Sequence, residues 1–167
     1  MSKKRENKFL SFIAVIIVIL FAGAIYTVVN SGNLYKNTTD NQQASNQIYK
    51  SKAMKFSIEV PSDFQVEENL PTITVKNAKG VVYIDRSGTN FENLEEYLEN
   101  LSKLNHFIIS NKENVSINTL PAVKGIIDGK KHYFIYAAPW TVYSIFTSSR
   151  ALFDDLDTIA QSFKYTP

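Results

Sequence analysis

The sequence predicts an α+β protein in which an N-terminal transmembrane helix precedes a single domain, whose central, mainly antiparallel sheet is covered by helices on both faces. Three observations support this fold class. Residues 9–29 are apolar and uncharged, strand-like alternation recurs between residues 54 and 147, and two segments carry apolar residues at helical spacing. With 44% hydrophobic residues, the remainder of the chain is large enough to bury one core.

The apolar run from Phe9 to Val29 predicts a membrane-spanning helix. At about 1.5 Å per residue it would be roughly 30 Å long, which matches the hydrocarbon core of a bilayer. The tail before it, residues 1–8, is basic, so the N-terminus is predicted to be cytoplasmic. The alternative is a cleaved signal peptide, since Ala22-Gly23-Ala24 resembles a cleavage site. Residues 25–29 continue the apolar run past that site and favour the uncleaved anchor.

Beyond the anchor we expect a tether and one exported domain. Residues 30–47 are polar and lack periodicity, as is typical of a flexible linker, and residues 48–167 form the extracytoplasmic domain. The chain has no cysteine, so this domain must be stable without disulfides. Acidic and basic residues are nearly balanced within it, so we expect no nucleic-acid partner.

Most of the domain shows strand patterns. Asp128-Gly129 predicts a hairpin, and Gly80 permits a second tight turn. Residues 133–136 and 142–146 are apolar on both faces, which predicts central strands. The expected strands are residues 54–60, 73–75, 81–85, 107–109, 115–117, 122–127, 131–137 and 141–147, with Pro61 ending the first and Pro139 preceding the last.

Two helices are expected. Asn93 is a suitable N-cap for the first, and Glu96 lies at the capping-box position. The second begins after Ser148-Ser149. Their apolar faces are Leu94, Tyr97, Leu98, Leu101 and Leu104 in the first, and Phe153, Leu156, Ile159, Ala160 and Phe163 in the second. Acidic residues on both helices, including Asp154, Asp155 and Asp157, are interpreted as solvated outer faces and not as metal ligands.

No sequence pattern indicates catalysis, so we predict that the protein is not an enzyme. There is no cysteine nucleophile, no G-x-S-x-G motif and no phosphate-binding glycine loop. His106 and His132 lack metal-ligand spacing and are each expected to be ordinary half-buried residues. We therefore predict no catalytic, cofactor-binding or metal-binding residue. Trp140 is the one candidate contact residue: if exposed, it would anchor a partner or ligand, although packing at a sheet corner is the favoured interpretation.

Several stretches resemble the PsbP family of exported proteins. They are residues 54–64, residues 91–97, the strands around Asp128-Gly129, and residues 159–164. The resemblance implies a central antiparallel sheet with helices on both faces. It also implies a role in scaffolding or assembly without a catalytic centre, and it transfers no ligand residue to this sequence.

Together these observations predict a single-pass membrane protein that exposes a non-catalytic binding or assembly module outside the cytoplasm. Its partner is an unknown protein or small ligand, and its membrane contact is the segment Phe9 to Val29. The first alternative is a sensor or carrier that binds a small ligand in a pocket between sheet and helix. The second is a secreted protein, if the N-terminal segment is cleaved.

Overall fold

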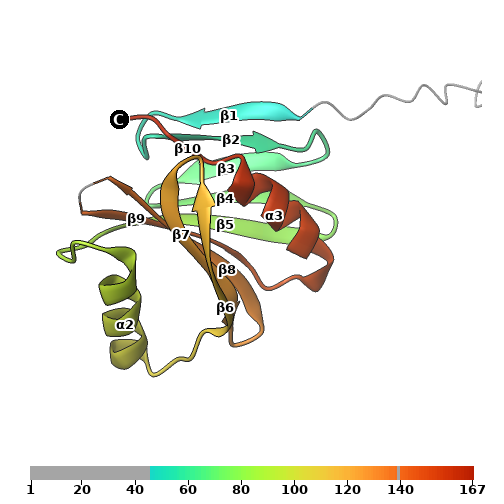
Figure 1. Cartoon of the computed structure of the whole chain (residues 1–167). Helices are drawn as coiled ribbons and strands as arrows, with labels where there is room; N and C mark the ends of the chain where they lie inside the picture. Colours follow the sequence, from blue (N-terminus) through green and yellow to red (C-terminus); the bar gives the residue numbers. More distant parts are fainter. Residues whose placement is uncertain (1–45, 139) are drawn as a thin grey trace, which may run out of the picture. The chain divides into compact units, whose positions relative to one another are not determined.

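The computed structural model describes residues 46–138 and 140–167, which form two antiparallel sheets and two α-helices (Figure 1). The predicted membrane span, Phe9 to Val29, and nearly all of the predicted linker lie outside these residues. Among the residues described, no helix is both long and apolar enough to cross a membrane.

The larger sheet has seven strands in the order β3-β4-β5-β9-β8-β7-β6, and the smaller sheet has three in the order β1-β2-β10. Every neighbouring pair is antiparallel. The strands of the larger sheet are β3 (Gln65–Asn69), β4 (Thr72–Asn77), β5 (Gly80–Gly88), β6 (Ser110–Ile117), β7 (Leu120–Ile127), β8 (Lys130–Ala138) and β9 (Thr141–Thr147). Those of the smaller sheet are β1 (Gln47–Ser51), β2 (Phe56–Val60) and β10 (Lys164–Tyr165).

The predicted hairpin and the predicted central strands are confirmed. Asp128 (φ 49°) and Gly129 (φ 78°) both lie in the left-handed region and join β7 to β8, as a two-residue turn of this kind requires. Strand β9 is the middle strand of the seven, with β8 beside it. Both are apolar on two faces because two separate hydrophobic clusters cover the sheet.

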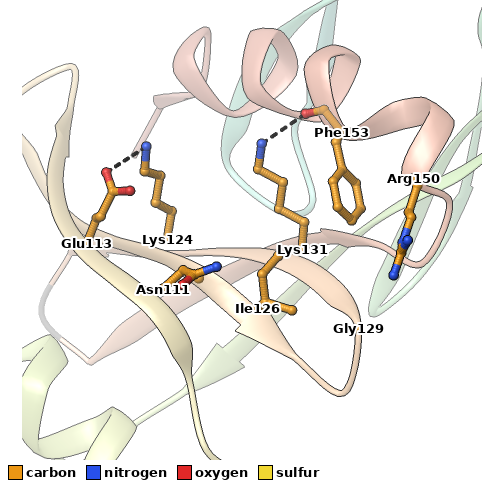
Figure 2. A pocket seen from close by; sticks show the side chains of 9 residues that line it. Asn111, Glu113, Lys124, Ile126, Gly129, Lys131, Arg150 and Phe153 are labelled. Carbon is orange, nitrogen blue, oxygen red and sulfur yellow. Dashed lines mark hydrogen bonds and ion pairs between the residues drawn. The ribbon is translucent and has the colours of Figure 1, made fainter.

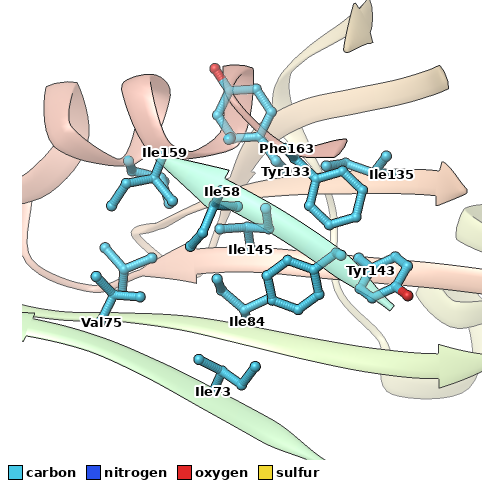
Figure 3. Packing of buried hydrophobic residues seen from close by; sticks show 14 of the residues in the cluster. Ile58, Ile73, Val75, Ile84, Tyr133, Ile135, Tyr143, Ile145, Ile159 and Phe163 are labelled. Carbon is cyan, nitrogen blue, oxygen red and sulfur yellow. The ribbon is translucent and has the colours of Figure 1, made fainter. Parts of the chain in front are cut away.

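The main cluster lies on one face of the larger sheet, beneath α3 (Phe153–Gln161) and the smaller sheet. Figure 3 shows Ile58 of β2 and Ile159 of α3 meeting Ile84 and Ile145 of the larger sheet. The second cluster packs α2 (Leu94–Asn105) on the opposite face. A mainly antiparallel α+β fold is thus confirmed, whereas the sequence did not predict that a second sheet shares the α3 side.

Helix α2 begins as predicted, because the Asn93 side chain accepts a hydrogen bond from the Glu96 backbone N–H at 2.9 Å. Leu94 and Leu98 are buried beneath it. Leu104, which the pattern placed on the apolar face, is 70% exposed, because the helix overhangs the sheet at its end. The predicted solvated acidic face is confirmed: Glu95 pairs with Lys112 at 2.5 Å on the protein surface.

Replacing Asn93 tests how much the N-cap hydrogen bond contributes to the stability of the domain. We expect Asn93→Ala to lower the free energy of unfolding by about 1 kcal/mol, because the first turn loses its side-chain acceptor. Asn93→Asp keeps an acceptor and is the control. Urea denaturation of the full chain in detergent, followed by circular dichroism, measures both variants; equal stabilities for Ala and Asp would contradict the assignment.

The start of the last helix differs from the prediction. A short 3-10 turn, η1 (Arg150–Leu152), precedes α3, and Ser149 makes no side-chain cap. Its hydroxyl instead donates to the Lys79 carbonyl at 2.7 Å, tying the β4–β5 turn to the helix. The Asp157 side chain was also expected to face solvent. Its carboxylate instead accepts a hydrogen bond from the Tyr133 hydroxyl at 2.8 Å.

Two strand assignments were wrong for identifiable reasons. Residues 107–109 are not a strand: Phe107 and Ile109 pack against the α2 cluster, and the Ser102 hydroxyl holds the Phe107 carbonyl at 2.5 Å. Strand β3 was missed because its sequence is polar, yet it forms the edge of the sheet through backbone pairing with β4. Charged edge strands of this kind resist pairing with other chains.

Candidate functional site

Trp140 lies between β8 and β9, and its side chain is 51% exposed. Its backbone has φ 68°, a left-handed conformation that is uncommon for a bulky residue. The Thr89 N–H donates to the Trp140 carbonyl at 2.9 Å, and the Trp140 N–H donates to the Tyr136 hydroxyl at 3.4 Å. The backbone is thus held by hydrogen bonds at the β8–β9 turn, while about half of the residue faces solvent and the rest is packed against the protein.

Two grooves adjoin the indole. The first, of about 470 Å³, lies along the end of β8, and Glu92 is the one charged side chain on its walls. The second, of about 420 Å³, lies toward the β3–β4 turn and includes Arg86. The first groove is lined by Glu92, Leu120, Pro121, Tyr136, Ala137, Ala138 and Trp140, and the second by Ala53, Met54, Leu70, Pro71, Arg86, Gly88, Trp140 and Thr141.

We call Leu70, Pro71, Arg86 and Trp140, on the second groove, the Trp140 surface. Leu70 is 58% exposed, so two large hydrophobic side chains from different turns lie on one groove and face solvent. Arg86 is half-buried, and its guanidinium donates to the Ala53 carbonyl at 3.3 Å. Apolar side chains exposed together, with a positioned cation beside them, are typical of a contact surface.

A third groove, of about 450 Å³, lies between the larger sheet and the start of α3 (Figure 2). Lys131 reaches Asp157 at 2.5 Å, the Phe153 carbonyl at 3.2 Å, and lies 5.5 Å from the Phe153 ring centre. Lys124 pairs with Glu113 at 2.8 Å. Both lysines are therefore engaged within the protein, and the space between them is bordered by Ile126 and the Phe153 ring.

The two histidines occupy different environments. His106 is exposed at the C-cap of α2 with φ 55°, contrary to the half-buried position expected for it. His132 is half-buried as expected, between the rings of Phe134 (5.4 Å) and Phe146 (4.8 Å). Burial, reinforced by the charge of Lys130, lowers the pKa of His132 to about 4. Neither of its buried ring nitrogens has a hydrogen-bond partner among the residues described.

Several acidic side chains form ion pairs with lysines. Asp155 pairs with Lys79 at 3.2 Å and Glu99 with Lys103 at 2.8 Å. Over residues 46–138 and 140–167, no group of three histidine, aspartate or glutamate side chains could hold a metal ion.

Comparison with known proteins identifies a related fold and no family. No known family profile matches the sequence, and no curated protein is similar to it. A crystal structure from Bacteroides thetaiotaomicron VPI-5482 is 14% identical over 74% of this chain and 49% of that chain, with a TM-score of 0.51. The solution structure of cyanobacterial PsbP (CyanoP) from Synechocystis sp. PCC 6803 is 9% identical over 78% of this chain and 98% of that chain, with a TM-score of 0.48.

These similarities concern architecture. The chain spans about half the length of the Bacteroides protein, and at 14% identity the match shows a shared fold alone. The cyanobacterial match has the lower TM-score and the lower identity of the two. Trp140 was the site residue that the sequence singled out. Leu70, Pro71 and Arg86 were missed because they lie on turns and strands far from Trp140 in sequence, and only the sheet order brings them to one groove.

Proposed function

We propose that the protein is a single-pass membrane protein whose extracytoplasmic domain is a non-catalytic binding or assembly module, with Trp140 at its contact surface. The proposal includes membership of the PsbP-type exported domains, for which the sequence resemblance provides the support. The observation that carries it is the half-exposed Trp140, held by backbone hydrogen bonds between two grooves. Rigidly presented tryptophans are frequent centres of binding surfaces.

The membrane topology gives the first test. Protease added to intact spheroplasts is expected to remove the domain, and carbonate washing is expected to leave the full chain in the membrane, because the apolar run Phe9 to Val29 stays in the bilayer. A cytoplasmic protein of the same cells serves as the protection control. Protection of the domain would contradict the orientation, and release of a shortened chain by carbonate would indicate a secreted protein.

A second candidate function is a small-ligand sensor or carrier. The groove between the larger sheet and α3 favours it, because a concave space of about 450 Å³ is within the usual range for small-ligand sites. Thermal denaturation with candidate small molecules distinguishes the two functions. A small molecule that raises the melting temperature of the full chain, and loses this effect when Phe153 is replaced by Ala, would favour the sensor.

A further inference from the structure

We propose that the Trp140 surface rests on the headgroup region of the same bilayer that holds the chain's anchor, and so orients the domain on the membrane. This inference rests on the proposed function, because it requires a domain tethered to a membrane. It assigns the contact surface one partner: a lipid surface with anionic headgroups.

The apolar part of the surface has the residue types that enter a bilayer interface. Trp140 (51% exposed) and Leu70 (58% exposed) lie on the same groove, which the exposed Pro71 also lines. Tryptophan is enriched at the membrane–water interface, where its ring contacts acyl chains and its N–H stays near water. The other exposed large hydrophobic residues among those described do not line this groove: Ile48 is on edge strand β1, Leu104 is near the end of α2, and Ile108 is in the loop after α2.

The charged part of the surface matches an anionic headgroup layer. Arg86 lines the groove, and its bond to the Ala53 carbonyl ties it to the loop of residues 52–55. Lys52 and Lys55 on that loop are both exposed. Glu92 lines the other groove, and the carboxylate of Asp85, next to Arg86, accepts a hydrogen bond from the Thr72 hydroxyl at 2.6 Å. An apolar tip bordered by cations is the pattern of proteins that lie on membrane surfaces.

The tether keeps this surface within reach of the bilayer. The predicted span ends at Val29 and the described domain begins at residue 46, so the connecting residues extend at most roughly 55–60 Å. Strand β1, at the start of the described domain, is only about 17 Å long, so the maximum extension of the connecting residues is about three times the length of this strand. A tethered surface meets its own membrane at high effective concentration, whereas a protein partner must first be recruited.

Trp140 is the only tryptophan of the chain, which makes the test direct. The full chain is reconstituted into vesicles of equal parts phosphatidylglycerol and phosphatidylcholine, with or without a spin-labelled lipid that quenches fluorescence just below the headgroups. Excitation at the red edge, where tyrosine does not absorb, isolates Trp140. We expect about a twofold or larger loss of emission with the labelled lipid, and a smaller loss in pure phosphatidylcholine.

Two variants and one control sharpen the result. Leu70→Asn and Arg86→Gln are expected to restore most of the emission, while Ile108→Asn, an exposed apolar residue outside the surface, is expected to change nothing. Equal emission with labelled and unlabelled lipid would overturn the inference. Emission that is unquenched in pure lipid but shielded from iodide in native membranes would also overturn it, and would assign the surface to a protein partner instead.

This experiment separates the inference from the proposed function. If carbonate releases the chain from the vesicles, the predicted transmembrane anchor is wrong. If the chain stays in the vesicles and Trp140 remains unquenched, the anchor stands and the membrane contact of the Trp140 surface is wrong.

Discussion

Phe163→Ala is expected to lower the free energy of unfolding by about 3–5 kcal/mol, the largest effect of any single substitution considered. Phe163 follows α3, is fully buried, and joins the smaller sheet to the larger one. Its ring stacks on Phe56 of β2 with centroids 5.3 Å apart, and it meets Tyr143 of β9 at 4.9 Å. Removing the ring therefore opens a cavity at the contact of three elements, with no neighbouring side chain free to fill it.

Phe153→Ala is the matched control for this prediction. Phe153 is the first residue of α3, the helix that Phe163 follows, but it is only half-buried, at the edge of the third groove, so its truncation removes less apolar contact. Urea denaturation of the full chain in detergent measures both variants. A cost for Phe163→Ala no greater than that for Phe153→Ala would show that the Phe163 ring does not join the two sheets as described.

The smaller sheet shows where sequence reasoning about this fold reached its limit. The sequence predicted the backbone conformation correctly where a few neighbouring residues determine it, as at the N-cap Asn93 and in the Asp128-Gly129 turn. Strand β10 has two residues and is defined only by pairing with β2 across the whole domain. No local pattern specifies such a strand, because its hydrogen-bond partner lies more than a hundred residues away in sequence.

Tyr143 illustrates the same limit for polar groups. The sequence indicated that its strand is apolar on both faces, and the side chain is fully buried. Its hydroxyl nevertheless has a partner, the Met54 carbonyl, in the loop before β2. Burial raises the pKa of the Tyr143 hydroxyl to about 12, so it stays protonated and remains a donor. A buried hydroxyl without this partner would be costly, but the partner is visible only after folding.

The Trp140 surface was predictable in part. A tryptophan beside Pro139 at a strand break indicated an unusual loop, and this is where the half-exposed indole lies. Leu70 gave no such signal, since an isolated leucine before a proline is ordinary in a turn. Its importance comes from the pairing of β3 with β4 and of β5 with β9, which places the β3–β4 turn beside the β8–β9 turn.

Acidification is expected to destabilise the domain through His132. Its pKa is lowered to about 4 in the folded state, against a usual value of 6.5, because burial between Phe134 and Phe146 outweighs the opposing charge of Asp128. As pH falls through 6.5, the unfolded chain takes up a proton that the folded chain still excludes. Stability is therefore full above that pH and declines toward pH 4, by about 2–3 kcal/mol after allowing for the partial exposure of the ring.

His132→Phe separates this effect from the titration of carboxylates. Phenylalanine keeps a flat ring in the stack with Phe146 but has no proton to gain, so the variant should lose about 2 kcal/mol less than the wild type between about pH 7 and pH 4.5. His106→Asn, at an exposed position where asparagine suits the left-handed backbone, should follow the wild type. Because all other groups titrate alike in the three proteins, the difference between their stability curves isolates His132. If the free energy of unfolding depends on pH in the same way for the wild type and His132→Phe, the prediction is wrong. The protonated imidazole would then have a solvent or acidic partner in the folded domain.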